Sequence, residues 1–226
     1  MLNKMNFFPK IVLLGPPASG KSTQFTRLKQ DFPEISHFAV RLFFEEEKRK
    51  QSHWSKIAIP DSRGWLPDHV VAKAAEEEIL KGKDGGLVIE GFPASAYQAD
   101  LFNDIVEKNN LNIEALVYIK VPRDVSISRA IQRLVCLNCD NGVNHVEPLS
   151  RNTLICPTCG APLTKRKDDI IEKFEQRLNI HHENIEKILD NINVPKLIID
   201  GTKSKDDVYK EIIEGLSLTS DLKNTL

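Results

Sequence analysis

The chain has 226 residues, of which 41% are apolar and 28% are charged, and its formal net charge is −1. This length suits one α/β domain with insertions, and the balanced charge gives no reason to expect nucleic acid or an anionic membrane as a partner. No apolar run approaches the roughly 20 residues that span a bilayer, and the first nine residues lack the apolar stretch of a signal peptide. We therefore expect a cytoplasmic protein.

Short apolar runs alternate along the chain with amphipathic stretches, which is typical of a parallel α/β sheet. The predicted strands are Ile11–Leu14, His37–Val40, Gly86–Glu90, Ala115–Ile119 and Lys196–Asp200. The predicted helices are Lys21–Gln30, Pro67–Leu80, Ala96–Lys108, Asp124–Val135, Lys167–Asn191 and Lys205–Leu216.

Two segments interrupt this alternation. The first, Arg41–Val71, is charged and loop-like, and we interpret its run Glu45–Lys50 as a solvated helix face. Within it, Gly64–Asp68 is typical of a turn before a helix, with Pro67 near the first turn. The second, Val135–Lys165, has little apolar periodicity, so it would need a metal ion to fold.

The segment Gly15–Ser22 fits the phosphate-binding pattern G-x-x-x-x-G-K-[ST], and it lies between the first predicted strand and helix. Backbone N–H groups, a helix N-terminus and the Lys21 side chain would together form an anion site. The Ser22 hydroxyl is then the expected contact for Mg²⁺. The alternative is a glycine- and proline-rich turn that merely resembles the pattern.

The four cysteines form two C-x₂-C pairs, Cys136 with Cys139 and Cys156 with Cys159. This spacing is typical of a structural zinc site with four thiolate ligands. Two disulfides or four unrelated thiols are the alternatives, and a reducing compartment argues against the disulfides. His145 lies between the pairs, and with four sulfur ligands available we expect it at the surface.

Several segments together resemble the adenylate kinases, in the long form with a zinc-bearing lid. The segments are Gly20–Gln24, Glu90–Pro93 with Gln98–Asp100, Val121–Pro122 with Arg129 and Arg133, Thr164–Asp169 with Arg177, and Asp200–Lys203. The resemblance implies a P-loop NTPase-type five-stranded parallel sheet with helices on both faces and two insertions. It divides the chain into a core (1–40, 72–134 and 167–226), a nucleoside-monophosphate-binding insertion (41–71) and a zinc-binding lid (135–166), and it implies a monomer.

The resemblance also implies ATP with Mg²⁺ as the phosphoryl donor and small-molecule nucleotides as the partners. Arg129 resembles the residue that stacks on the donor adenine, although Arg129 and Arg133 taken alone could be surface charges on one helix face. Asp168 and Asp169 would orient Arg166 or begin the long helix. The implied catalytic residues are Lys21, Arg133, Arg166 and Arg177, and the implied donor-binding residues are Gly15, Ala18, Ser19, Gly20, Lys21, Ser22, Thr23, Arg129 and Lys203.

The acceptor half departs from the family pattern S-T-G-D-x-L-R. Val40, Leu42 and Glu45 replace its threonine, aspartate and arginine, and Ala94 replaces the arginine of a second motif. Glu90 stands before Gly91 where the family has aspartate, whereas Gln98, which reads the acceptor base in the family, is retained.

Among the basic residues of the acceptor insertion, Arg41 is the best candidate for a replacement phosphate contact, because it follows a strand directly and has apolar neighbours. We therefore predict acceptor binding by Arg41, Gly91 and Gln98. Three functions follow: a nucleoside monophosphate kinase acting on AMP or a related monophosphate, an ATP-dependent kinase of another small acceptor, and an ATP-binding switch with little catalysis.

Overall fold

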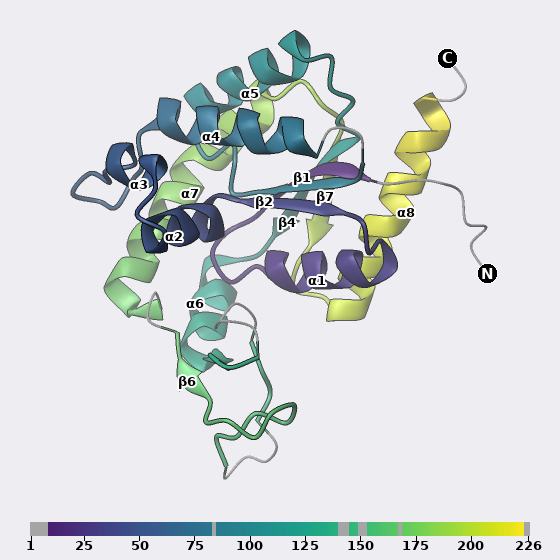
Figure 1. Ribbon diagram of the computed structural model, residues 1–226. Helices are drawn as coiled ribbons and strands as arrows, with labels where there is room; N and C mark the ends of the chain where they lie inside the picture. The colour runs from purple at the N-terminus through teal and green to yellow at the C-terminus, as the bar shows by residue number, and fades with distance from the viewer. Residues whose placement is uncertain (1–8, 83–84, 140–144, 149–152, 167–168, 224–226) are drawn as a thin grey trace.

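The computed structural model describes residues 9–82, 85–139, 145–148, 153–166 and 169–223, and a five-stranded sheet lies at its centre (Figure 1). All four strand pairings in this sheet are parallel, in the order β2-β3-β1-β4-β7. The strands are β1 (Lys10–Leu14), β2 (Ser36–Ala39), β3 (Leu87–Glu90), β4 (Ala115–Lys120) and β7 (Lys196–Asp200). The predicted fold class and the five predicted strands are therefore confirmed.

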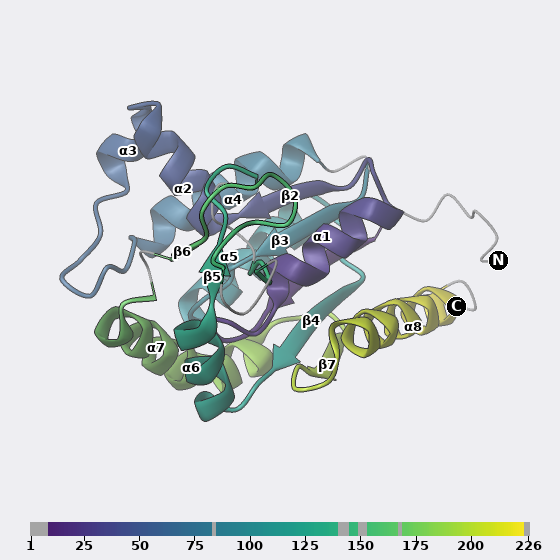
Figure 2. The ribbon, with the colours of Figure 1, turned by 90° about the horizontal axis from the view of Figure 1, so that it is seen from below.

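Helices cover both faces of the sheet, so the central strands are buried on both sides (Figure 2). Ile11 and Leu13 belong to one core cluster, with residues of α1 (Lys21–Asp31) and α8 (Lys205–Lys223). Val12 and Leu14 belong to the other, with residues of α4 (Asp68–Lys81), α5 (Ala96–Lys108) and α7 (Ile171–Asn191). Because successive side chains of a strand point to opposite faces, one apolar run supplies both clusters.

The insertion after β2 is more helical than the sequence predicts. Val40 begins a helix, α2 (Val40–Arg49), instead of ending a strand, and α3 (His53–Ile57) follows. The loop-like prediction for 41–71 is thus wrong over its first half. Phe43 and Phe44 each make edge-to-face contacts with Trp54, and this ring cluster gives the two short helices a common core.

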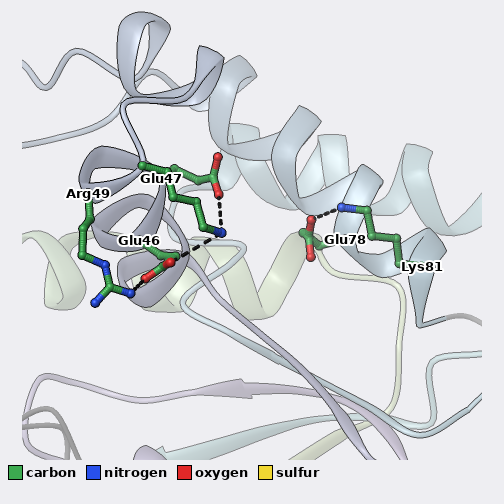
Figure 3. A network of polar contacts seen from close by, with 6 residues as sticks. Glu46, Glu47, Arg49, Glu78 and Lys81 are labelled. Carbon is green, nitrogen blue, oxygen red and sulfur yellow. Dashed lines mark hydrogen bonds and ion pairs between the residues drawn. The ribbon is translucent and has the colours of Figure 1, made fainter.

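Charged side chains at the end of α2 pair with one another (Figure 3), and most of them are solvent-exposed, as expected of a solvated helix face, whereas the Glu47 side chain is only 14% exposed. Glu46 pairs with Arg49, and Lys50 lies 3.5 Å from both Glu46 and Glu47. Each ion pair at three- or four-residue spacing stabilises a helix by about 0.2–0.5 kcal/mol.

The helix predicted over Asp124–Val135 ends earlier, because its last residues form a strand. α6 spans Arg123–Gln132, Arg133 is extended, and β5 (Leu134–Val135) pairs antiparallel with β6 (Thr164–Lys165). This two-stranded ribbon is the base of the cysteine-bearing segment. The prediction that Arg129 and Arg133 share one helix face is therefore wrong.

Other boundaries differ at helix ends. The predicted helix over Lys167–Asn191 begins at Ile171, after Asp169, while Lys167 and Asp168 lie outside the described residues. The last helix continues beyond Leu216 to Lys223. Among the described residues, no helix has both the length and the apolar character needed to cross a membrane.

Candidate active site

The phosphate-loop pattern forms a tight turn between β1 and α1, at the carboxyl edge of the sheet. Gly15 has φ +157°, and a Cβ there would lie 2.5 Å from Ser19 Oγ and 2.7 Å from the Ile119 carbonyl oxygen, so the turn requires glycine. The Lys21 ammonium donates to the carbonyl oxygens of Gly15 at 2.8 Å and Pro16 at 3.1 Å. The turn and its lysine are thus held together as one anion-binding unit.

Positive charge gathers around Lys21. Burial lowers the pKa of its ammonium to about 8; the Glu90 carboxylate acts in the opposite direction, and Arg133, Arg166 and Arg177 add to the lowering. Like charges are costly to hold together without counter-charge. The convergence of these lysine and arginine side chains from three separate segments therefore indicates a site for a polyanion.

One buried carboxylate holds two of these arginines. Asp169, whose side chain is 4% exposed, lies 3.4 Å from Arg133 Nε and 3.7 Å from Arg177 Nη2. We expected Asp168 and Asp169 to orient Arg166 or to begin α7. Asp169 precedes the helix and lies between Arg133 and Arg177, and its N–H donates to the Arg166 carbonyl oxygen at 3.0 Å, whereas Asp168 lies outside the described residues.

Arg129 and Lys203 line the same cavity near the loop after β7. Arg129 Nη2 donates to the Gly201 carbonyl oxygen at 2.8 Å, which ties α6 to the loop after β7. Burial lowers the Arg129 pKa from its ordinary value, while Asp200 acts against this. Lys203 pairs with Glu211 of α8.

A cavity of about 590 Å³ opens along the carboxyl edge of the sheet. Its described lining holds eight Lys or Arg residues against three Asp or Glu residues. The residues predicted for nucleotide binding or catalysis that line it are Gly15, Ala18, Ser19, Gly20, Lys21, Ser22, Thr23, Arg41, Gly91, Arg129, Arg133, Arg166, Arg177 and Lys203. The carboxyl edge is where parallel α/β sheets bind their ligands.

Comparison with known proteins gives the family. A family model described as adenylate kinase matches residues 13–196. The chain belongs to the adenylate kinase family. It is 30% identical over 213 residues to an adenylate kinase of Streptomyces coelicolor, covering 92% of this chain and 98% of that protein. It is also 28% identical to one of Thermoanaerobacter sp. (92% and 97% covered) and 27% identical to one of Archaeoglobus fulgidus (89% and 95% covered).

The acceptor half of this adenylate kinase-like site differs from the family pattern also in its contacts. Arg41 Nη1 donates to both carboxylate oxygens of Glu45, at 2.8 and 2.9 Å. Glu45 occupies the place of a family arginine, so the acidic replacement engages Arg41, the best candidate for a substitute. Leu42 and Ala94 add apolar lining beside it.

Gln98 does not line the cavity with the other predicted residues. It is 2% exposed, its Oε1 accepts from the Ala94 N–H at 2.8 Å, and its Nε2 donates to Asp68 Oδ1 at 2.7 Å. Asp68 Oδ1 also accepts from the indole N–H of Trp65 at 3.0 Å. This amide is therefore fixed in orientation and linked to an aromatic ring that does line the cavity.

Two oxygen groups lie together where the family pattern expects Mg²⁺. The Ser22 hydroxyl donates to Glu90 Oε1 at 3.5 Å, and His37 Nε2 lies 3.3 Å from Glu90 Oε2. Burial alone would raise the pKa of Glu90; contact with His37 and the charges of Lys21 and Arg41 outweigh it and hold the pKa below its usual range. An ionised carboxylate beside a hydroxyl suits a hard cation.

The four cysteines come together in the segment between β5 and β6, which lies at the base of Figure 1, and their sulfur atoms lie within 4.8 Å of one another. Cys136 Sγ lies 3.5 Å from Cys159 Sγ, and Cys139 Sγ lies 3.7 Å from Cys156 Sγ. Zn–S bonds of about 2.3 Å in a tetrahedron put sulfurs about 3.8 Å apart, so the cluster fits zinc. His145 lies outside the cluster, with Nε2 3.0 Å from Glu147.

Sequence analysis did not find one further group in the cavity. His181 of α7 lines it, 3.5 Å from the Tyr118 hydroxyl. Burial lowers the His181 pKa to about 3, with Lys21 and His182 contributing, so the ring is neutral at physiological pH. In the sequence, His181 lies on the apolar face of a predicted helix, and no motif or spacing indicates that it lines a cavity.

Proposed function

We propose that this chain transfers the γ-phosphoryl group of ATP to AMP or a related nucleoside monophosphate, as a phosphotransferase of the adenylate kinase family. The observation that carries the proposal is the convergence of Lys21, Arg133, Arg166 and Arg177 around one cavity that opens beside the phosphate loop. Family membership favours this function over the two alternatives, a kinase of another small acceptor and an ATP-binding switch.

On the donor side, the loop Gly15–Ser22 holds the polyphosphate, with Thr23 in the following helix turn and Lys21 against the β- and γ-phosphates. Arg133 and Arg177 approach the transferred group from the lid side, steadied by Asp169. Phosphoryl transfer needs positioning and neutralisation of charge more than covalent help. Arg129 and Lys203 complete the proposed ATP site near its adenine.

Mg²⁺ would be held by Ser22, with Glu90 in place of the family's aspartate. When bound, it neutralises charge on the phosphate oxygens of the nucleotide. The longer glutamate arm is compatible with this role because His37 and Ser22 contact its two oxygens and restrict it.

On the acceptor side, we propose that Arg41 exchanges Glu45 for the acceptor phosphate. The side chain of Arg41 is 35% exposed and that of Glu45 54%, and exposed pairs contribute only about 0.2–1 kcal/mol. A charge-assisted bond to phosphate contributes more, about 1.5–3 kcal/mol, so the exchange is favourable. Gly91 and Gln98 complete the proposed acceptor site.

We propose further that the cysteine cluster holds a structural Zn²⁺ that stiffens the lid, and that the protein works as a cytoplasmic monomer. The lid (135–166) would close over the phosphates and exclude water that competes for the phosphoryl group. The insertion 41–71 is the corresponding acceptor domain, and the remaining segments are the core.

A coupled assay of ADP release with ATP and a panel of nucleoside monophosphates tests the function. We expect turnover with AMP or a close relative at about 1–100 per second, abolished by Lys21→Ala. Tight ATP binding without turnover on any monophosphate would refute the kinase proposal. Turnover confined to an acceptor without a base would instead support the second alternative.

A further inference from the structure

The wall that α7 contributes to the cavity is mostly apolar, but two of its side chains are polar. The α7 residues that line the cavity are Phe174, Arg177, Ile180, His181, Ile185 and Ile188. Arg177 already belongs to the proposed catalytic set, whereas His181 has no role in it. The two are four residues apart in one helix, so they lie on the same face. A polar ring on an otherwise apolar cavity wall is a candidate contact for a ligand.

The surroundings of His181 place its ring close to the start of the phosphate loop. Its Nε2 lies 3.5 Å from the hydroxyl of Tyr118, a β4 residue that is 7% exposed. Tyr118 is in register with Leu14 of β1, the residue that precedes the loop and also lines the cavity. Lys21 is near enough to lower the pKa of His181, after the larger effect of burial.

The contact with Tyr118 decides which ring nitrogen of His181 carries the proton. A neutral imidazole has one N–H donor and one acceptor nitrogen. A phenol is a stronger donor than a neutral imidazole, so the Tyr118 hydroxyl donates to Nε2 and the ring proton is on Nδ1. Among the described residues Nδ1 has no hydrogen-bond partner, and it is not one of the fully buried polar atoms that lack one. The Nδ1–H is therefore accessible from the cavity that the ring lines.

The charges around Lys21 explain why a neutral donor is useful at this point. Arg133, Arg166 and Arg177 already add their positive charges to that of Lys21, and each further cation would be costly to hold there before a ligand binds. A neutral N–H supplies a hydrogen bond to a phosphate oxygen without this cost. The same cavity has lost one cationic contact, because Ala94 stands where the family has a phosphate-binding arginine.

We propose that His181 binds the phosphates held beside Lys21 through its Nδ1–H, and that Tyr118 positions the imidazole by fixing its tautomer. The proposal rests on the proposed function for the identity of these phosphates, and it adds one binding residue to that site. Tyr118 acts only through His181, so it is a positioning residue and does not touch the ligand.

Calorimetric binding of inorganic tripolyphosphate to the purified protein tests the contact without any turnover. An asparagine amide lies near the position of Nδ1, whereas a glutamine amide lies near that of Nε2. His181→Asn should therefore keep the affinity within about threefold, while His181→Gln and His181→Phe should each lose about tenfold or more, as expected for a hydrogen bond to a charged group. His182→Phe changes the exposed neighbour on α7 and is the matched control. Equal affinities of His181→Phe and this control overturn the proposal, and so do equal losses in all three His181 variants.

A double-mutant cycle isolates the positioning role of Tyr118. Tyr118→Phe removes the hydroxyl that fixes the tautomer, so it should weaken tripolyphosphate binding a few-fold in the parent chain. In the His181→Asn background it should have no further effect, because an amide has no tautomer to fix. An equal effect of Tyr118→Phe in both backgrounds would mean that Tyr118 acts through packing and would overturn its positioning role.

Turnover assays with ATP and nucleoside monophosphates keep this proposal separate from the proposed function. Loss of tripolyphosphate affinity in His181→Phe, in a chain that turns over no monophosphate, would refute the kinase function and retain the His181 contact. Turnover by the parent chain together with an unchanged tripolyphosphate affinity in His181→Phe would retain the function and overturn the contact.

Discussion

Asp169 provides the sharpest test of how the donor site is held in the absence of nucleotide. It lies between Arg133, 12% exposed, and Arg177, 36% exposed. Removing one partner of a buried ion pair costs about 3–5 kcal/mol, and the partial exposure of Arg177 reduces this for Asp169→Asn to about 2–3 kcal/mol. For a chain of this size, that corresponds to a Tm lower by roughly 5–10 °C.

Nucleotide should offset this loss, because the phosphates then supply the negative charge that the variant lacks. Thermal melts of Asp169→Asn and the parent chain, each with and without a saturating non-hydrolysable ATP analogue, measure both effects. We expect the deficit in Tm to shrink by half or more with the analogue. Glu172→Gln, an exposed acidic residue nearby in the first turn of α7, is the matched control. The reasoning fails if the deficit is absent, or if it is the same with and without the analogue.

Three further predictions concern other parts of the molecule. The ammonium of Lys21 has a pKa near 8 in the free chain and should become fully protonated when phosphates bind. ATP affinity should therefore be constant below pH 8 and fall above it, which calorimetry from pH 7 to 9.5 measures. The substitution Lys21→Arg should remove this pH dependence. Glu45→Gln should weaken the Arg41–Glu45 pair and lower the KM for AMP several-fold, with a stability change below about 1 kcal/mol. A raised KM would show that Glu45 itself serves the acceptor. Chelation should release about one zinc per chain and lower the Tm, and a metal-free protein insensitive to chelators would contradict the zinc site.

The sheet could be predicted from the sequence because its central strands are buried on both faces. Such strands appear as uninterrupted apolar runs, and helices with one apolar face separate them. The phosphate loop could be predicted because its chemistry is local: Gly15 and Lys21 belong to one turn, and their spacing is itself the signal.

The insertion helices were predicted only in part, as a helix face over Glu45–Lys50, because their apolar partners are few and lie outside this charged run. α2 packs its Phe43 and Phe44 against Trp54 of the next helix, whereas the run Glu45–Lys50 dominates the composition of the segment. The end of α6 escaped for another reason. Leu134 and Val135 continue a helical pattern, but their pairing with Thr164 and Lys165 depends on a partner some thirty residues away.

The acceptor side shows most clearly where sequence reasoning ends. The cavity lining there comes from the start of α2, from Trp65 and from the loop after β3, and no spacing rule links these segments. Gln98 was predicted from a motif to read the base, yet its amide bonds to Asp68 and Ala94 and it is 2% exposed. The base-reading role of Gln98 therefore stays a prediction, and the hydrogen bonds show only that its amide is held in one orientation.

The two halves of the site are built on different interactions, and this explains why one departs from the family pattern without the other. In the proposed function the donor half binds a polyphosphate, whose charge must be met by several cations at once, so the loss of Lys21 or Arg133 would have no local remedy. The acceptor brings a single phosphate and a base. Under this proposal, binding lost at Glu45 and Ala94 is recovered through other contacts of the acceptor, which need not include several cations. An intact phosphate loop thus constrains the donor alone, and the acceptor is decided by residues that only the fold brings together.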